Sequence, residues 1–288
     1  MILNKEFVSA KLPKRLSYQN KGDFGHVLII GGSVGMSGSV CMTANAAMRS
    51  GAGLVTVAVP SEIVPVVSTK TTEAMVLLLP SENGMLCLKS VDTIRKFLPK
   101  VNTVVVGMGA RICDGLYAVL EMLLVEFMGT LIVDADGLNV LSRSKELLDA
   151  PRKCNMVLTP HPGEMSRLLS LPISEIQSNR EVLAKEFAFS HKTVVVLKGE
   201  NTVITDGDEL YVNPTGNPGM ATGGSGDVLA GIIGGLAAQG ISCIESSACG
   251  CFLHGLAGDI AVKDKTEYGL IATDLIEYIP KAFLALNV

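Results

Sequence analysis

The sequence predicts an α/β fold with a mostly parallel central sheet covered by helices on both faces. Short runs rich in β-branched residues recur along the 288-residue chain, and most of them are continuously apolar. Strands that are buried on both faces have this pattern. Stretches with helical spacing lie between the runs, and such alternation is typical of parallel strands joined by right-handed helical crossovers.

The elements can be assigned in chain order. The predicted strands are residues 26–31, 54–59, 75–79, 103–107, 131–134, 156–159 and 193–198. The predicted helices are residues 39–49, 115–127, 174–190, 226–239, 244–262 and 273–286. Residues 202–205 and 210–212, separated by Asp206-Gly207-Asp208, are expected to form a hairpin. No long linker or repeat divides the chain, so residues 1–288 are predicted to form a single domain.

Composition excludes several classes of protein. Hydrophobic residues make up 48% of the chain and charged residues 18%, with a mean hydropathy of +0.41. A chain this apolar can bury enough surface to offset its ordering entropy, so disorder is excluded. The 24 basic and 28 acidic residues leave a net charge of -4, which disfavours nucleic acid as a partner.

The chain has no membrane or secretion signal that we recognise. The longest apolar run, residues 228–238, is shorter than the roughly 20 residues that cross a bilayer, and the first residues lack an apolar signal segment. The seven cysteines form no CxxC pair and the four histidines no ligand-spaced cluster. We therefore expect reduced thiols, no structural metal site and a cytoplasmic location.

Glycine, proline and polar residues follow the predicted strands. The loops read GGSVGMSG, GMGA, DADGLN, TPHPGE and KGENT. In open α/β sheets, ligands bind beyond the carboxyl ends of the strands. These loops are therefore predicted to line a substrate cleft, where Asp134 and Asp136 would need partners because they end an apolar strand.

The strongest local signal is the segment NPTGNPGMATGGSGD at residues 213–227, which leads directly into an apolar helix. Backbone N–H groups at Gly223, Gly224 and Gly226 can converge on an anion, and the helix start adds unpaired amides. Asp227 lies in the first helical turn. A helix cap explains Asp227 alone, but the density of glycine favours phosphate binding.

Asp227 is also a candidate base. A helix N-terminus is expected to lower its pKa. Phosphoryl transfer tolerates such a weak base because its transition state is loose. The sequence contains no GxxxxGK[ST] motif and no GxGxxG spacing, so P-loop and Rossmann sites are disfavoured.

The set of motifs resembles the ribokinase-like superfamily and, within it, the ADP/ATP-dependent NAD(P)H-hydrate dehydratases. The resemblance runs from Lys21 to about Pro280 and rests on the five loop motifs, on the segment at 213–227 and on Arg49-Ser-Gly-Ala-Gly-Leu-Val55. Many members carry an N-terminal epimerase domain. The residues before Lys21 are too few for one, so a dehydratase alone is expected, with its epimerase partner encoded separately.

The resemblance implies a reaction that restores NADH or NADPH from the hydrated cofactor, with ADP or ATP as co-substrate and Mg²⁺ on the nucleotide phosphates. It implies Asp227 as the catalytic base. It also implies a nucleotide and phosphate site formed by Lys198, Gly199, Glu200, Asn201, Thr202, Asn217, Gly223, Gly224, Ser225 and Gly226. The hydrated dinucleotide would contact Gly38, Ser39, Gly107, Gly109, Asp136, Asn139, His161 and Asp227. Relatives are commonly homotetramers.

Simpler roles remain open for several of these residues. Lys198 at a strand end can be merely solvated, and His161 between two prolines can be part of a rigid surface turn. Glu164 can simply cap the next helix, and Gly107 and Gly109 can serve tight strand–helix turns. The loop Gly107-Met-Gly109-Ala110 departs from the Gly-Pro-Gly of many relatives but keeps both glycines.

Two other functions compete with the dehydratase. A small-molecule kinase for a hydroxymethylpyrimidine or hydroxyethylthiazole alcohol shares similar TPHPGE and KGENT segments. Such a kinase would stop at the phosphorylated product. A non-catalytic nucleotide sensor is disfavoured because Asp227 is intact. The sequence does not choose between ADP and ATP.

Overall fold

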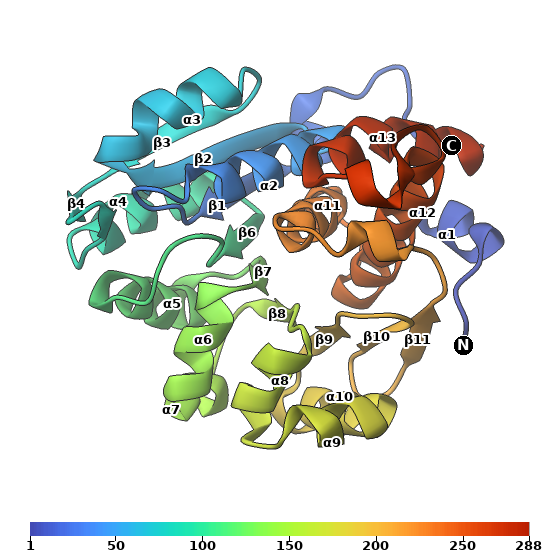
Figure 1. The fold of residues 1–288 in the computed structure, drawn as a ribbon. Helices are drawn as coiled ribbons and strands as arrows, with labels where there is room; N and C mark the ends of the chain where they lie inside the picture. The colour runs from blue at the N-terminus through green and yellow to red at the C-terminus, as the bar shows by residue number, and fades with distance from the viewer. Residues whose placement is uncertain (288) are drawn as a thin grey trace.

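A nine-stranded sheet forms the centre of the molecule in the computed structural model, which describes residues 1–287 (Figure 1). The strand order is β11-β10-β9-β8-β7-β6-β1-β2-β3. All neighbouring strands from β9 along the sheet to β3 pair in parallel. Strand β10 pairs antiparallel with both β9 and β11. A small separate hairpin pairs β4 with β5. The strands are β1 His26–Ile30, β2 Leu54–Pro60, β3 Met75–Leu79, β4 Ser81–Glu82, β5 Met85–Leu86, β6 Thr103–Val106, β7 Thr130–Val133, β8 Asn155–Leu158, β9 Val194–Leu197, β10 Thr202–Thr205 and β11 Leu210–Asn213.

Helices cover both faces of this sheet (Figure 1). One face packs against α1 Lys5–Lys11, α2 Ser37–Arg49, α3 Val64–Lys70, α11 Ser225–Ala238, α12 Cys243–Gly269 and α13 Ala272–Ala285. The other packs against α4 Ser90–Phe97, α5 Asp114–Glu126, α6 Asp136–Arg143, α7 Lys145–Asp149, α8 Pro162–Leu169, α9 Ile173–Ser178 and α10 Arg180–His191.

The strand β1 shows why the apolar runs predicted this architecture. Val27 and Ile29 belong to the core on one face of the sheet, and Leu28 and Ile30 belong to the core on the other. All four side chains are fully buried. Because alternate residues of a strand point to opposite faces, a strand covered on both sides must be apolar at every position. Every predicted strand, and the 202–212 hairpin, is confirmed.

The predicted helix over 174–190 is wrong as one element. Two helices, α9 and α10, cover this range and meet at Asn179, whose φ of -132° and ψ of 33° are not helical. The Asn179 side chain donates to the Glu175 carbonyl, and asparagine competes in this way with the helical backbone. The hairpin of β4 and β5 was not predicted, because strands of two residues are too short for a periodicity.

Two further sequence expectations concern thiols and membranes. All seven cysteines are free, and five of them, Cys41, Cys87, Cys154, Cys249 and Cys251, are buried. Within residues 1–287, no helix combines the length and the apolar character that a membrane crossing needs. One sheet takes strands from residue 26 to residue 213, which supports the single domain that we continue to propose.

Strand order reverses between β1 and β6, which are neighbours although they are distant in sequence. The helix α11 lies over this region and makes close contacts through glycine. An ideal Cβ on Gly231 would stand 2.3 Å from the Thr43 carbonyl oxygen of α2, and one on Gly234 would stand 2.7 Å from the side chain of Val105 on β6. These contacts bring the start of α11 to the carboxyl edge of the sheet, where ligands bind in such folds.

We expect Gly231→Ala to destabilise the protein by about 1–2 kcal/mol. Alanine favours a helix over glycine by about 1 kcal/mol. Forcing a methyl group against a backbone carbonyl costs more, because overpacking a filled core costs about 1–3 kcal/mol and the carbonyl cannot turn aside. Chemical denaturation measures the difference. Gly38→Ala is the control, since no atom lies within 4 Å of its ideal Cβ, and equal stability of the two variants would contradict the packing argument.

Candidate active site

Three neighbouring strands bring together a buried ion pair at their carboxyl ends. Asp134 follows β7 and is 2% exposed. Its Oδ1 accepts hydrogen bonds from Lys198 Nζ after β9 and from Thr159 Oγ1 after β8, both at 2.8 Å. The Lys198 ammonium also lies 3.8 Å from Glu164 Oε2. Lys198 is therefore held inside the site and is not a solvated strand end.

The start of α11 faces this ion pair. An ideal Cβ on Gly226 would stand 3.4 Å from Lys198 Nζ and 3.8 Å from Asp134 Oδ2. A methyl group at 226 would be in van der Waals contact with both charged groups, so a side chain longer than alanine would crowd them. Burial by itself lowers the pKa of Lys198, but the carboxylates of Asp134, Glu164 and Asp227 together raise it. The ammonium is thus fixed next to the glycine loop, where an anion would need it.

Asp227 has a pKa raised to about 6, contrary to the expectation from its place in the first helical turn. Burial is the largest cause, and the negative charge of Asp134 adds to it. A hydrogen bond with Ser39 and the charge of Lys198 act in the opposite direction. Loss of water around the carboxylate therefore outweighs the favourable helix terminus.

The segment around His161 is a tight helix cap beside the ion pair. His161 Nδ1 accepts from the backbone N–H groups of Gly163 and Glu164, and Glu164 Oε2 accepts from the His161 N–H at 2.8 Å. The capping role foreseen for Glu164 is confirmed. Burial raises the pKa of Glu164 to about 6, and burial, followed by the charges of Lys198 and Arg167, lowers the pKa of His161.

The predicted glycines divide into two groups. An ideal Cβ on Gly107 would stand 2.1 Å from the Asp134 carbonyl oxygen, and one on Gly109 would stand 2.8 Å from the Met36 carbonyl oxygen. The two glycines have φ of +118° and +60°. Backbone packing explains both of them without any ligand. Nothing lies within 4 Å of an ideal Cβ on Gly38 or Gly223, so their Cβ sides face open space that a ligand could enter.

A strained residue separates the two aspartates after β7. Ala135 has φ 49° and ψ -116°, a conformation that costs an L residue about 1–3 kcal/mol. The strain points Asp134 at Lys198 and leaves Asp136 to accept from the Arg111 N–H at 2.8 Å and from Asn139 Nδ2 at 3.4 Å. Strain of this kind clusters at functional sites.

The remaining predicted residues form two turns. In the turn between β9 and β10, Gly199 and Asn201 have φ of 138° and 51°, and Thr202 Oγ1 donates to the Gly199 carbonyl at 2.8 Å. Glu200 is exposed there. In the other turn, Asn217 Oδ1 accepts from the Gly219 N–H at 3.2 Å.

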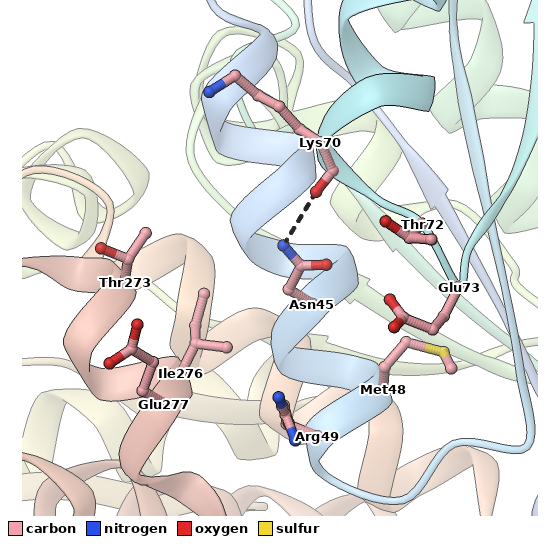
Figure 2. Close-up of a pocket in the computed structure, with 9 residues that line it drawn as sticks. All are labelled: Asn45, Met48, Arg49, Lys70, Thr72, Glu73, Thr273, Ile276 and Glu277. Carbon is pink, nitrogen blue, oxygen red and sulfur yellow. Dashed lines mark hydrogen bonds between the residues drawn. The ribbon is translucent and has the colours of Figure 1, made fainter.

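Within residues 1–287, no group of three or more acidic, thiol or imidazole side chains is arranged to hold a metal ion. A separate pocket of about 520 Å³ lies on the outside of α2, between this helix, α13 and the segment after α3 (Figure 2). It contains none of the predicted site residues. Its lining consists of Asn45, Met48, Arg49, Lys70, Thr72, Glu73, Thr273, Ile276 and Glu277.

Sequence reasoning missed Thr159, His254 and Asp259, which also contact the site. Ser225 Oγ lies 3.3 Å from His254 Nε2, and Asn217 Nδ2 donates to Asp259 Oδ1 at 3.0 Å. His254 and Asp259 lie within the long helix α12, each next to a glycine, and glycines inside a helical pattern do not by themselves indicate which loop the helix packs against. Thr159 directly follows β8 and is the first residue of the TPHPGE loop, and its place in that motif is a signal that could have identified it.

A glycine loop that begins a helix above a parallel sheet, with a carboxylate in its first turn, defines a ribokinase-like protein. The fold is similar to a crystal structure of the ADP/ATP-dependent NAD(P)H-hydrate dehydratase from Bacillus subtilis, co-crystallised with ATP and Mg²⁺. The TM-score is 0.86 at 28% identity over 99% of this chain and 98% of that one. Residues 27–281 match the model of the NAD(P)H-hydrate dehydratase family, and the chain belongs to this family.

Two curated relatives support the assignment. The chain is 37% identical to the ADP-dependent (S)-NAD(P)H-hydrate dehydratase of Neisseria meningitidis, over 85% of this chain and 80% of that protein. It is 40% identical to the bifunctional NAD(P)H-hydrate repair enzyme of Moorella thermoacetica, over 97% of this chain and 53% of that protein. The chain thus spans about half the length of the bifunctional relatives.

We expect Asp227→Asn to stabilise the protein at pH 7.5. A raised carboxyl pKa means that the folded state binds the proton more tightly than the unfolded state, so stability falls as pH rises from about 4 through 6. Above pH 6 the ionised group costs about 1–2 kcal/mol, after a discount for its partial exposure. Thermal denaturation of both proteins should show a gain that shrinks toward pH 4.

The control is Glu126→Gln, where the shift has the opposite sign. A hydrogen bond from Arg95 lowers the pKa of Glu126, so its neutralisation should give no gain at pH 7.5. An Asp227→Asn protein that is less stable than the parent at pH 7.5 would show that Asp227 is not a destabilising buried charge.

Proposed function

We propose that this chain catalyses the dehydration of the S-epimer of hydrated NADH and NADPH, with ADP or ATP as phosphate donor. The observation that carries the proposal is Asp227 in the first turn of α11, beside the open Gly223 and close to Lys198. Membership in the dehydratase family supports the same reaction. The proposed products are the reduced cofactor, phosphate, and AMP from ADP or ADP from ATP.

The proposed chemistry has two steps. Asp227 accepts the proton of the ring hydroxyl while that oxygen attacks the terminal phosphorus of the nucleotide, and the shorter nucleotide leaves. The phosphate group then departs with the ring C–O electrons as the ring nitrogen donates its lone pair, and loss of a ring proton restores the double bond. A pKa of about 6 suits a base at neutral pH, because the group is mostly ionised yet still basic.

The residues of α11 and β9 would hold the transferred phosphate. Backbone N–H groups at Gly223, Gly224 and Gly226 carry partial positive charge at the helix start, and Lys198 adds a full charge. We propose the nucleotide site of Lys198, Gly199, Glu200, Asn201, Thr202, Asn217, Gly223, Gly224, Ser225 and Gly226. We propose the hydrate site of Gly38, Ser39, Gly107, Gly109, Asp136, Asn139, His161 and Asp227.

Magnesium fits this site as an ion carried by the nucleotide. Asp134 and Asp227 offer carboxylate oxygens beside the loop, but Asp134 is already bound to Lys198 and Thr159. Mg²⁺ commonly keeps several waters and binds through one or two carboxylates plus phosphates. When bound, Mg²⁺ would neutralise charge on the phosphates. Because Asp134 is engaged, Asp227 is the carboxylate of this chain that would lie nearest to the bound ion.

A kinase acting on a hydroxymethylpyrimidine or hydroxyethylthiazole alcohol would use the same base and anion loop and would release the phosphorylated alcohol. The family match favours the dehydratase over this alternative. We further propose a cytoplasmic homotetramer that works with an NAD(P)H-hydrate epimerase. The net charge of -4 disfavours nucleic acid as a partner.

The proposed reaction predicts recovery of the reduced nicotinamide absorbance when hydrated NADH is mixed with the protein, Mg²⁺ and ADP or ATP. The recovery should require nucleotide, and the faster of the two nucleotides identifies the donor. A mixture without nucleotide is the control. Absence of recovery with both nucleotides, together with release of a phosphorylated alcohol from a pyrimidine or thiazole substrate, would replace the dehydratase with the kinase.

Asp227→Asn should lower turnover by about a hundredfold or more and leave nucleotide affinity nearly unchanged, because the anion loop stays intact. In the parent protein, turnover should fall about tenfold per pH unit below about pH 6, where Asp227 becomes protonated. Glu164→Gln is the matched control, since Glu164 has a similar pKa but caps α8, and its removal should leave this acidic limb in place. Turnover of Asp227→Asn near that of the parent would remove Asp227 from the mechanism.

A further inference from the structure

One face of α12 supports the whole phosphate-binding segment of residues 213–226. His254 and Gly258 are four residues apart, as are Gly255 and Asp259, so the four positions share a helix face. Asp259 Oδ2 accepts from the Gly216 N–H at 2.9 Å, and its Oδ1 accepts from Asn217 Nδ2 at 3.0 Å. Asp259 therefore fixes the first half of the segment.

The two glycines of this face bring the helix against the segment. An ideal Cβ on Gly255 would stand 2.2 Å from Thr215 Oγ1, and one on Gly258 would stand 2.3 Å from Met220 Sδ. A side chain at 255 would also meet the Thr215 backbone, with its C and O atoms 2.6 Å away, and would push the segment away from α12, whereas one at 258 would displace the Met220 side chain. The distance between helix and loop is thus set by direct contact, which makes the other contacts of this face well defined.

His254 is the member of the face that reaches the anion loop itself. Its Nε2 lies 3.3 Å from Oγ of Ser225, the first residue of α11. Burial and, to a smaller extent, the charge of Lys198 together lower the pKa of His254 to about 4, although a hydrogen bond with the Ser225 backbone acts in the opposite direction. The imidazole is therefore neutral near pH 7 and carries one N–H, on either Nδ1 or Nε2.

The position of that proton decides what Ser225 can do. If Nε2 accepts, the Ser225 hydroxyl donates its proton to the ring and turns lone pairs toward a bound phosphate, which repels it. If Nε2 carries the proton and donates to Oγ, the hydroxyl keeps its own proton for the phosphate. A charge-assisted hydrogen bond to a phosphate oxygen is worth more than one to a neutral ring.

We propose that His254 is a positioning residue that donates from Nε2 to Ser225 Oγ and so directs the Ser225 hydroxyl proton at the transferred phosphate. This inference rests on the proposed function of the loop. His254 does not touch the substrate and acts through Ser225, two residues before Asp227.

A double-mutant cycle tests this coupling. His254→Leu and Ser225→Ala should each lower turnover by about ten- to a hundredfold, because each variant loses the hydrogen bond that Ser225 directs at the charged phosphate. Combined, they should lower turnover no further than Ser225→Ala alone, because His254 would have nothing left to position. His254→Gln places an amide near Nε2 and should restore turnover to within about threefold of the parent.

Asp259→Asn is the matched control from the same helix face. Its amide would meet the N–H donors of Gly216 and Asn217, so it loosens the segment without touching Ser225. Its effect should multiply with that of Ser225→Ala. If His254→Leu only loosens the loop, its effect on turnover will also multiply with that of Ser225→Ala, and that outcome would overturn the proposal.

Nitrogen-15 NMR of histidine gives a readout independent of turnover. The chain has four histidines, so the spectrum of His254→Gln assigns the His254 signals by difference. The proposal requires the proton on Nε2, and a proton on Nδ1 overturns it. This measurement on the parent protein also decides the case if His254→Leu fails to fold.

The same cycle measured on ADP and ATP binding separates this inference from the proposed function. If the parent binds nucleotide but does not dehydrate the hydrate, the proposed function is rejected. The inference still holds in that case if the effects of His254→Leu and Ser225→Ala on nucleotide affinity are coupled. If dehydration occurs without coupling, the function stands and the inference is rejected. If the parent protein neither binds nucleotide nor turns over the hydrate, both the proposed function and this inference are rejected.

Discussion

The buried contact between Lys198 and Asp134 is the interaction around which the site is organised. At 2.8 Å it joins the ends of β9 and β7 across β8, and Thr159 of the intervening segment completes it. A buried charge is costly unless it is paired and hydrogen-bonded. The pair therefore fixes the loops after three strands relative to one another, and the strained Ala135 is held in place by the same contacts.

One ammonium faces three carboxylates in this region, those of Asp134, Glu164 and Asp227. The imbalance has a cost in stability, because burial and the charge of Asp134 disfavour the ionised form of Asp227. The same two causes make Asp227 a stronger base than an exposed aspartate. For the proposed reaction, the cost in stability of the ionised Asp227 is therefore linked to its greater strength as a base.

Most of the fold could be predicted because burial on both faces leaves a direct mark on each strand, as in the run from Val27 to Ile30. The break at Asn179 could not, since a single side-chain contact ends one helix and starts another within a helical periodicity. Glycines were ambiguous for a related reason. Gly107 meets a backbone carbonyl, whereas Gly223 faces open space, and nothing in the local sequence distinguishes the two.

The sequence by itself determined the α/β class, the glycine loop that ends at Asp227 and the resemblance to a family, because these depend on local composition and order along the chain. The tertiary structure alone decided the direction of the Asp227 pKa and the contact of His254 with Ser225. A pKa depends on excluded water and on charges brought from distant strands. A contact between helices depends on which of their faces meet, and neither quantity is encoded in any short stretch of sequence.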